Sequence, residues 1–331
     1  KQTEMRELSR LMKASPNEWN MDIEWDDIAE KYAQTIKRTQ EIARNAGVLS
    51  AGAKLNQDIA DLINKCRSAE FQIAVVGVIK AGKSMLLNAL IGLELAPVGL
   101  NSKTAALTKF RSSNKGNYVH VRFYSKAEWD NLKDSASRSR KELSAEGESS
   151  LEKRLSEKSV LDAAKKWIGH GDITETYSDL MGFQEGIKRW TAADSDDHLF
   201  AAEVEVGIDK KLFNMPEEVV FVDTPGLHDP VKYRSKITED YIGNANAVLV
   251  AVKPDALGEE AYKTVTTVLD YAGSNRKKVY IIGTQQDKLE KKADYEQLID
   301  GEDGWIQRLT ESGHYKDRRA ASAQIFTVSA K

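Results

Sequence analysis

The chain has 331 residues, of which 41% are hydrophobic and 30% are charged, so it can bury a core and is neither disordered nor a coiled coil throughout. Its 48 Lys and Arg residues and 51 Asp and Glu residues give a formal charge of -3. The chain therefore has no overall basic excess that would indicate nucleic acid as its main partner. The single cysteine, Cys66, excludes an intramolecular disulfide and a cysteine metal cluster, and it is typical of a reducing compartment such as the cytoplasm.

Residues 1–68 are expected to form an N-terminal helical segment. From position 25 to about position 66, apolar residues recur mostly at helical spacing among charged neighbours. No stretch reaches the roughly 20 apolar residues that a membrane-spanning helix needs, so we expect any membrane contact to be peripheral. The chain begins without Met and ends directly after Ser329-Ala330-Lys331, which leads us to expect a piece of a longer protein.

Residues 69–331 have the pattern of an α/β fold. Short apolar runs typical of buried strands alternate with helical patterns such as 261–272. Two segments of alternating polarity are expected nearer a sheet edge and antiparallel, which predicts a mixed, mainly parallel sheet. A stretch rich in Ser, Lys, Glu and Arg, from about 126 to 197, predicts a solvated helical insertion. The buried runs are 73–76, 219–222, 247–250, 279–282 and 324–328, and the alternating segments are 118–123 and 204–208.

The phosphate loop, residues 77–84, has the sequence G-V-I-K-A-G-K-S and matches G-x-x-x-x-G-K-S between a strand and a helical run. Its backbone N–H groups are expected to surround phosphate oxygens at the positive end of the following helix. Lys83 would then reach the β and γ phosphates, and the Ser84 hydroxyl would bind Mg²⁺. The nucleotide-binding residues predicted here are Gly77, Ala81, Gly82, Lys83 and Ser84.

The second motif is acidic: Asp223-Thr224-Pro225-Gly226 follows the buried strand that ends at Val222. Asp223 is expected to hold Mg²⁺, often through water, and the Gly226 N–H to face the γ-phosphate. Taken alone, these four residues are also compatible with a type I or II turn. The phosphate loop upstream favours the nucleotide site.

A guanine-reading motif is indicated by Thr284-Gln285-Gln286-Asp287, which stands where N/T-K-x-D is found. A carboxylate at Asp287 accepts hydrogen bonds from guanine N1 and N2, which adenine cannot supply, so GTP and GDP are the expected ligands. Gln285 replaces the usual lysine and is expected to loosen the base pocket. As an isolated tetrapeptide the motif is as typical of an ordinary loop. After the last strand, Ser329-Ala330-Lys331 completes the set, with the Ala330 N–H directed to guanine O6.

Together these motifs resemble the GTPase domain of the dynamin superfamily, particularly bacterial dynamin-like proteins. The resemblance rests on residues 80–84, 88–92 and 97–104, extends over about 71–331 and is weak in the insertion. It implies that Thr104 is the switch-one threonine, which closes over Mg²⁺ and helps to place the attacking water. It also implies that the N-terminal helices are the first part of a helical bundle.

The same resemblance implies Mg²⁺-dependent GTP hydrolysis, activated by dimerisation of GTPase domains and coupled to membrane binding or remodelling through parts outside this chain. The protein would then be cytoplasmic or peripheral at a membrane, with no nucleic-acid partner. Lys80 stands where its ammonium could stabilise charge near the β–γ bridging oxygen, and a solvated lysine on the loop is the equal alternative. Ile79 cannot orient water, and Leu227 replaces the catalytic Gln of Ras-like GTPases.

Two other functions stay open. A nucleotide-binding scaffold with little or no hydrolysis is favoured by the departures at Ile79, Leu227 and Gln285. A monomeric switch GTPase of the septation or ribosome-assembly type is disfavoured by the N-terminal helices, the insertion and the lack of a basic surplus. The six Trp residues are scattered along the sequence and predict core packing rather than a lipid-inserting or base-stacking cluster.

Overall fold

The computed structural model describes residues 25–47, 50, 55–56, 59–60, 62–63, 70–77, 81–96, 106–142, 149–192, 196–225, 238–239, 241–253, 259–273, 275–285, 297–301 and 304–329. The chain divides into two compact units, residues 1–71 with 214–219, and residues 72–213 with 220–331. Within the described part, no helix combines the length and the apolar character that crossing a membrane requires.

The first unit is built on the amphipathic helix α2 (Trp25–Asn45). Ala33 is fully buried, while Tyr32 and Ile42 are 63% and 61% exposed. Short helical pieces at 55–56, 59–60 and 62–63 accompany α2. Asn56 Oδ1 accepts hydrogen bonds from Gln40 Nε2 at 2.9 Å and from Arg44 Nη2 at 2.7 Å, so the piece at 55–56 is held to the last turns of α2 by polar contacts.

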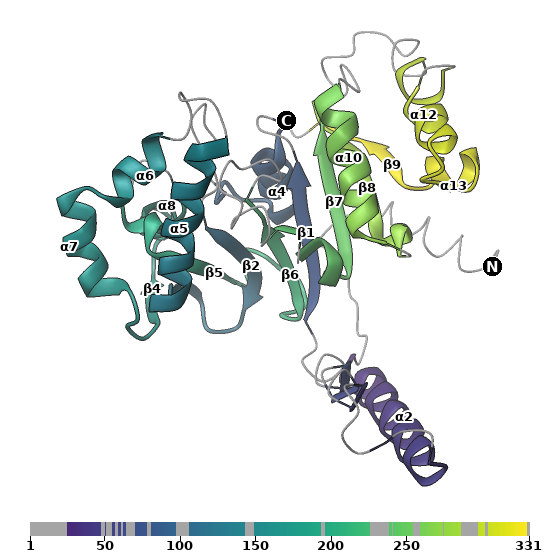
Figure 1. The fold of residues 1–331 in the computed structure, drawn as a ribbon, viewed down its shortest axis with the longest axis horizontal. Helices are drawn as coiled ribbons and strands as arrows, with labels where there is room; N and C mark the ends of the chain where they lie inside the picture. The colour runs from purple at the N-terminus through teal and green to yellow at the C-terminus, as the bar shows by residue number, and fades with distance from the viewer. Residues whose placement is uncertain are drawn as a thin grey trace. The chain divides into compact units, whose positions relative to one another are not determined.

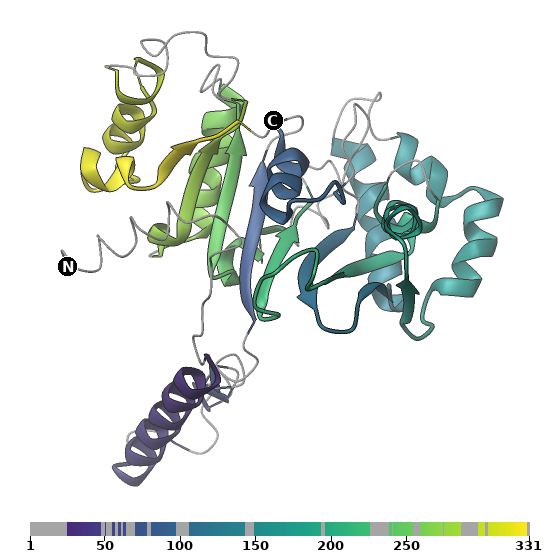
Figure 2. The same ribbon diagram turned by 180° about the vertical axis from the view of Figure 1, so that it is seen from behind.

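The second unit contains a nine-stranded sheet in the order β4-β3-β5-β2-β6-β1-β7-β8-β9 (Figures 1 and 2). Parallel pairs join β1 to β7, β7 to β8, β8 to β9 and β2 to β5, whereas β2–β6, β3–β4 and β3–β5 are antiparallel. The predicted mixed, mainly parallel sheet is thus confirmed. The strands are β1 (Phe71–Gly77), β2 (Leu107–Ser113), β3 (Asn117–Phe123), β4 (Ile173–Tyr177), β5 (Ala201–Asp209), β6 (Val219–Asp223), β7 (Ala247–Val252), β8 (Val279–Gly283) and β9 (Ile325–Thr327).

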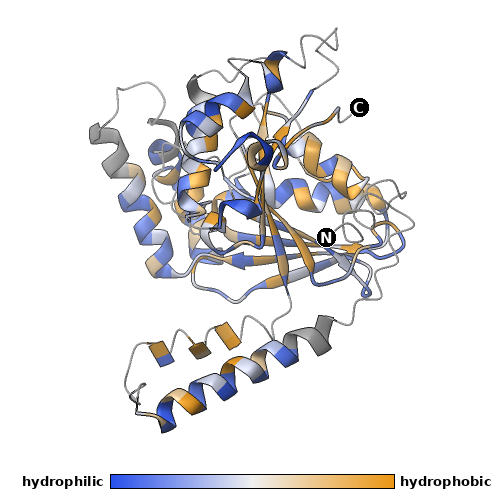
Figure 3. Cartoon of the chain, turned by 90° about the vertical axis from the view of Figure 1, so that its right-hand side faces the viewer, coloured by the Kyte–Doolittle hydropathy of each residue, from blue (hydrophilic) through white to orange (hydrophobic). Residues whose placement is uncertain are grey.

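The parallel end of the sheet carries a large apolar core. Val76, Val250 and Ile281 are fully buried there, and the helices α10 (Glu259–Tyr271), α12 (Trp305–Glu311) and α13 (Arg318–Ser322) supply the covering side chains. Figure 3 shows the strands in the middle of the picture largely in orange, the hydrophobic end of the scale. These strands read as continuous apolar runs because they are buried on both faces.

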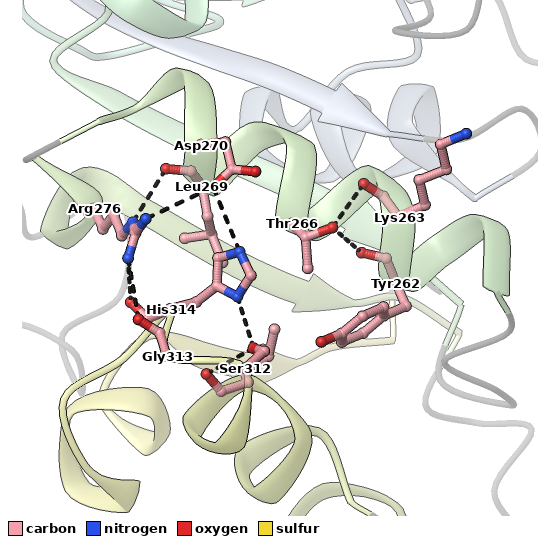
Figure 4. A network of polar contacts seen from close by, with 10 residues as sticks. Tyr262, Lys263, Thr266, Leu269, Asp270, Arg276, Ser312, Gly313 and His314 are labelled. Atoms are coloured by element: carbon pink, nitrogen blue, oxygen red, sulfur yellow. Dashed lines mark hydrogen bonds and ion pairs between the residues drawn. The ribbon is translucent and has the colours of Figure 1, made fainter.

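A polar network fastens the end of α10 to the segment after α12 (Figure 4). Arg276, in the short helix η3 (Arg276–Lys278), donates to the carbonyl oxygens of Leu269, Gly313 and His314 at 3.4, 3.3 and 3.2 Å. His314 Nδ1 lies 2.6 Å from Ser312 Oγ. One guanidinium therefore satisfies three carbonyls at helix ends, where backbone acceptors lack partners within the helix.

The insertion is helical over α5 (Lys126–Glu142), α6 (Ser149–Leu155), α7 (Lys158–Trp167) and α8 (Leu180–Thr191), as predicted, with a short 3-10 turn η2 (Asp197–Leu199). It also contains β4, which the sequence did not predict. Trp167 and Trp190 pack on Phe123 with ring centroids 4.8 and 5.5 Å away. Trp129 packs on Phe200 at 5.6 Å, so these three tryptophans, scattered in sequence, each pack against a phenylalanine ring.

Candidate functional site

The phosphate loop leaves β1 at Gly77 and enters α4 (Lys83–Ile91) through Gly82. A Cβ at Gly77 would lie 2.7 Å from the carbonyl oxygen of Ala251 in β7, so no side chain fits there. Gly82 has φ +85, a left-handed conformation that suits glycine, and a Cβ there would meet Thr284 Oγ1 at 3.2 Å. The glycines of the motif are therefore required by close packing and by backbone conformation.

Lys83 and Asp223 meet although they are far apart in the sequence. Lys83 Nζ forms an ion pair with Asp223 Oδ1 and donates a 2.7 Å hydrogen bond to the Thr224 carbonyl oxygen. Their side chains are 13% and 1% exposed. The pairing brings a cation at the start of α4 against a carboxylate at the end of β6, and each compensates the charge of the other in a site largely shielded from water.

Thr224 fixes the position of Asp223. Its hydroxyl donates to the Val75 carbonyl oxygen at 3.0 Å, which ties the end of β6 to β1. Thr238 is fully buried and donates to the Pro225 carbonyl oxygen at 2.9 Å, so the chain on the far side of the acidic motif is held as well. Asp223 is thus placed by a backbone that is anchored on both sides.

Thr284 joins the phosphate loop to the end of β8. Its hydroxyl donates to the Ala81 carbonyl oxygen and lies 3.2 Å from the Val252 carbonyl oxygen. The backbone N–H of Thr284 donates to the same Val252 oxygen at 2.8 Å. The two loops predicted to hold phosphate and base are therefore fastened to each other through one buried side chain.

The segment after β9 reaches the same edge of the sheet. The backbone N–H of Val328 donates to the Gly283 carbonyl oxygen at 2.8 Å, which places Ser329 beyond the carboxyl ends of β8 and β9. Ser84 lies in the first turn of α4 and is partly exposed. Ligands of open α/β sheets bind at this carboxyl edge. The structure thus gathers the described nucleotide-motif residues at one edge.

Several predicted site residues lie outside the described part of the chain, and their roles stay predictions. They are Lys80, Thr104, Gly226, Asp287 and Ala330.

Asn88 has a structural role near this site that was not predicted. Its Oδ1 accepts from the backbone N–H groups of Leu95 at 3.0 Å and Ala96 at 2.7 Å, and its Nδ2 donates to the Ala96 carbonyl oxygen at 3.0 Å. An 8% exposed amide with these partners shapes the turn after α4. A polar residue inside an apolar helical run was the signal that could have indicated this.

Within the described residues, no three His, Cys, Asp or Glu side chains gather closely enough to hold a metal ion. The predicted metal ligands that can be located are the Ser84 hydroxyl and the Asp223 carboxylate, which supply oxygen donors. Oxygen donors are the ligands that Mg²⁺ prefers, and Mg²⁺ commonly completes its coordination with waters and substrate phosphates. The donor chemistry of this edge therefore fits Mg²⁺ together with a nucleotide.

Comparison with known proteins gives a consistent result. The sequence profile described as "Dynamin family" matches residues 73–284, which is more than half of the chain. Dynamin-like protein 1 of Campylobacter jejuni subsp. jejuni is 26% identical over 271 residues, covering 81% of this chain and 34% of that protein. Bacterial dynamin-like protein of Nostoc punctiforme is 40% identical over 85 residues, covering 24% of this chain and 12% of that protein.

A similar fold is found in a solved structure described as "An oligomerised bacterial dynamin pair provides a mechanism for the long range sensing and tethering of membranes". The TM-score is 0.56 at 21% identity, and the match covers 92% of this chain and 38% of that one. The chain thus spans 34% of the length of the Campylobacter relative and 38% of this neighbour. At this identity the likeness shows the fold.

Proposed function

This chain belongs to the dynamin family, and on that premise we propose that it binds and hydrolyses GTP at the carboxyl edge of its sheet. The observation that carries the proposal is the meeting of Lys83 with Asp223 beside a glycine-bounded loop. A lysine at a helix start and a carboxylate at a strand end are the groups that P-loop enzymes use for phosphates and Mg²⁺. The motif order along the chain supports the same reading.

In this proposal Lys83 exchanges partners when nucleotide binds. Its Nζ leaves Asp223 and Thr224 for β- and γ-phosphate oxygens, and the backbone N–H groups of the phosphate loop hold the remaining oxygens. Asp223 and Ser84 would hold Mg²⁺, which would neutralise part of the phosphate charge. Because the Asp223 carboxylate is held by a fixed strand end, it needs little reorganisation for that task.

Roles for five further residues are proposed on sequence grounds. Thr104 helps to place the attacking water, and Lys80 stabilises the charge that develops near the β–γ bridging oxygen. Asp287 accepts hydrogen bonds from guanine N1 and N2. The Gly226 N–H contacts the γ-phosphate, and the Ala330 N–H contacts guanine O6. Positioning and electrostatic stabilisation then account for the rate, as in phosphoryl transfer generally.

We further propose that turnover is activated by self-association through the GTPase domain and coupled to a membrane surface through parts outside this chain. The description of the neighbouring structure as an oligomerised bacterial dynamin pair that tethers membranes supports this proposal by analogy. The protein would act as a cytoplasmic or peripheral membrane protein, without nucleic acid.

The test is GTP turnover per molecule, measured over a wide range of protein concentration with Mg²⁺. We expect turnover that rises with concentration, is selective for GTP over ATP, and falls about 100-fold or more in Lys83→Ala, because a charge-stabilising donor is lost. Lys263→Ala, on α10, is the control for loss of a lysine elsewhere.

Other outcomes separate the alternatives. Turnover that is detectable but independent of concentration would favour a monomeric switch GTPase. Tight GTP binding without turnover would contradict the catalytic proposal and favour a nucleotide-binding scaffold.

A further inference from the structure

We propose that Thr238 is a positioning residue for GTP hydrolysis, whose hydroxyl orients the peptide group between Pro225 and Gly226 so that the Gly226 N–H faces the γ-phosphate. This inference rests on the proposed function, which gives that N–H its contact with the γ-phosphate. Thr238 itself lies outside every nucleotide motif of the sequence. Three observations carry the inference: the hydrogen bond of Thr238, the anchoring of its segment, and the partner that Lys83 holds next to it.

The Thr238 hydroxyl reaches back to the acidic motif from 13 positions further along the chain. It donates to the Pro225 carbonyl oxygen at 2.9 Å, and the residue is fully buried. A buried hydroxyl has lost its contacts with water, so native proteins keep one where it makes a hydrogen bond. This bond gives the hydroxyl a partner and holds the Pro225 carbonyl in one direction.

The direction of the Pro225 carbonyl matters because of the N–H on the other side of the same peptide group. A peptide group is planar and almost always trans, so its C=O and its N–H point in opposite directions. The N–H opposite the Pro225 carbonyl belongs to Gly226, the group proposed to contact the γ-phosphate. A hydroxyl that holds the carbonyl therefore also sets the direction of the N–H, and a donor fixed in advance needs little reorganisation during the reaction.

The segment that contains Thr238 is anchored to its neighbours. Next to it, the Glu239 carboxylate accepts a hydrogen bond from the Tyr271 hydroxyl at the end of α10. Further along the same segment, the Gly243 carbonyl oxygen accepts a 2.8 Å hydrogen bond from Lys278 Nζ in η3. Contacts with two other elements thus hold this segment, so the Thr238 hydroxyl acts on the acidic motif from a fixed position.

The preceding peptide group is held by a different residue. The Thr224 carbonyl oxygen accepts a 2.7 Å hydrogen bond from Lys83 Nζ. In the proposed function Lys83 moves to phosphate oxygens when nucleotide binds, and this carbonyl then loses its donor. The bond from Thr238 to Pro225 uses no group that the nucleotide recruits. It therefore persists in the GTP-bound protein, where the orientation of the Gly226 N–H matters.

The experiment compares nucleotides with and without a γ-phosphate. Dissociation constants for GTPγS and GDP, each with Mg²⁺, are measured by isothermal titration calorimetry for wild type, Thr238→Val and Thr238→Ser. Valine keeps the shape of the side chain and removes the hydroxyl, whereas serine keeps the hydroxyl. We expect Thr238→Val to weaken GTPγS binding about five- to tenfold, the size of one hydrogen bond, and to leave GDP binding unchanged. Thr238→Ser should bind both nucleotides like wild type.

The ratio of the two dissociation constants separates positioning from stability. A hydroxyl that only stabilised the fold would affect GTPγS and GDP equally, because both nucleotides need the phosphate loop. The turnover number for GTP should also fall in Thr238→Val and recover in Thr238→Ser. Thr238→Cys, whose thiol is a weak donor, is compared with Thr238→Ser should Thr238→Val fail to fold.

Thr191→Val is the matched control. Thr191 is 1% exposed, and its hydroxyl donates to the Ile187 carbonyl oxygen at 2.8 Å, so its burial and its bond resemble those of Thr238. It lies at the end of α8 in the insertion. We expect the ratio of the dissociation constants for GTPγS and GDP to be unchanged in this variant.

An unchanged ratio in Thr238→Val would overturn the inference and leave the proposed function standing. An equal change of the ratio in Thr238→Ser or in Thr191→Val would overturn it as well, because the change would then not depend on the Thr238 hydroxyl. Absence of guanine nucleotide binding in wild type would instead contradict the proposed function itself. The two failures are therefore distinguishable in one series of titrations.

Discussion

Tyr315 shows how a single buried group can set a pH dependence. Its side chain is 7% exposed in the core beside α12, and its hydroxyl has no hydrogen-bond partner among the described residues. Burial raises the pKa of Tyr315 to about 12. Tyr177 shifts in the same direction, because burial and the neighbouring Glu175 carboxylate both raise its pKa.

Tyr315→Phe is expected to keep or slightly raise stability at neutral pH, by at most about 1 kcal/mol, because it removes an unsatisfied hydroxyl. Between pH 10 and 12 the unfolded tyrosine loses its proton while the folded one keeps it, so the wild-type protein loses stability as pH rises. The slope per such tyrosine is at most about 1.4 kcal/mol per pH unit. The variant should lose less stability over that range.

Urea denaturation of wild type and Tyr315→Phe at pH 7.5, 10 and 11 checks this. Tyr32→Phe is the control, since Tyr32 is 63% exposed. The same alkaline loss in wild type and Tyr315→Phe would contradict a role for this hydroxyl.

At the scale of elements, α8 packs on β4 through a glycine. A Cβ at Gly186 would lie 2.1 Å from Tyr177 Oη and 2.3 Å from Tyr177 Cζ, which no real contact allows. In a helix interior, Ala is normally more stabilising than Gly by about 1 kcal/mol. Here the crowding dominates, so Gly186→Ala is expected to lower the free energy of unfolding by about 1 to 3 kcal/mol.

Chemical denaturation measures that change, and a double-mutant cycle locates its cause. In a Tyr177→Ala background the penalty of Gly186→Ala should disappear, because the ring that it meets is gone. Gly243→Ala is the control, since nothing lies within 4 Å of its added Cβ. A penalty that persists without Tyr177 would mean that helix packing elsewhere is responsible.

The strands that the sequence predicted are those with continuous apolar runs or clear alternation, such as β7 and β3. It did not predict β2, L-T-K-F-R-S-S, or β4, I-T-E-T-Y. Both strands contain few apolar residues. In β2, for example, Lys109 forms an ion pair with Glu203 of the neighbouring β5 at 2.8 Å. Strands stabilised by cross-strand polar pairs have weak apolar patterns, and they are recognised only once their neighbours are known.

The site was predictable to the level of motifs. Gly-rich spacing indicated the phosphate loop because local backbone conformation requires it. The contact between Lys83 and Asp223 depends on β6 lying next to β1, which is a property of strand order. The positive φ of Gln285, at 61°, likewise depends on the phosphate loop that its side chain packs against. Such features depend on neighbours in the tertiary structure, and a local sequence pattern contains no information about those neighbours.

At the scale of the whole molecule, the Lys83–Asp223 pair links two parts of the nine-stranded sheet. Lys83 starts the helix that follows β1, on the parallel side, whereas Asp223 ends β6, which pairs antiparallel with β2. The link is made by charges with little access to water. Removing one partner of such a pair leaves the other charge buried and uncompensated.

Asp223→Asn is therefore expected to lower the free energy of unfolding of the nucleotide-free protein by about 2 to 4 kcal/mol. If nucleotide phosphates take over Lys83, as proposed, saturating GDP without Mg²⁺ should shrink the difference between variant and wild type, because Lys83 then has another anionic partner and the metal that Asp223 is proposed to hold is absent. Urea denaturation with and without GDP measures both quantities.

Glu203→Gln is the control: its more exposed pair with Lys109 should contribute less than about 1 kcal/mol, and the effect of the substitution should be the same with and without GDP. A large loss in Asp223→Asn that GDP leaves unchanged would mean that Lys83 does not transfer to the phosphates, and that the pair serves the sheet alone.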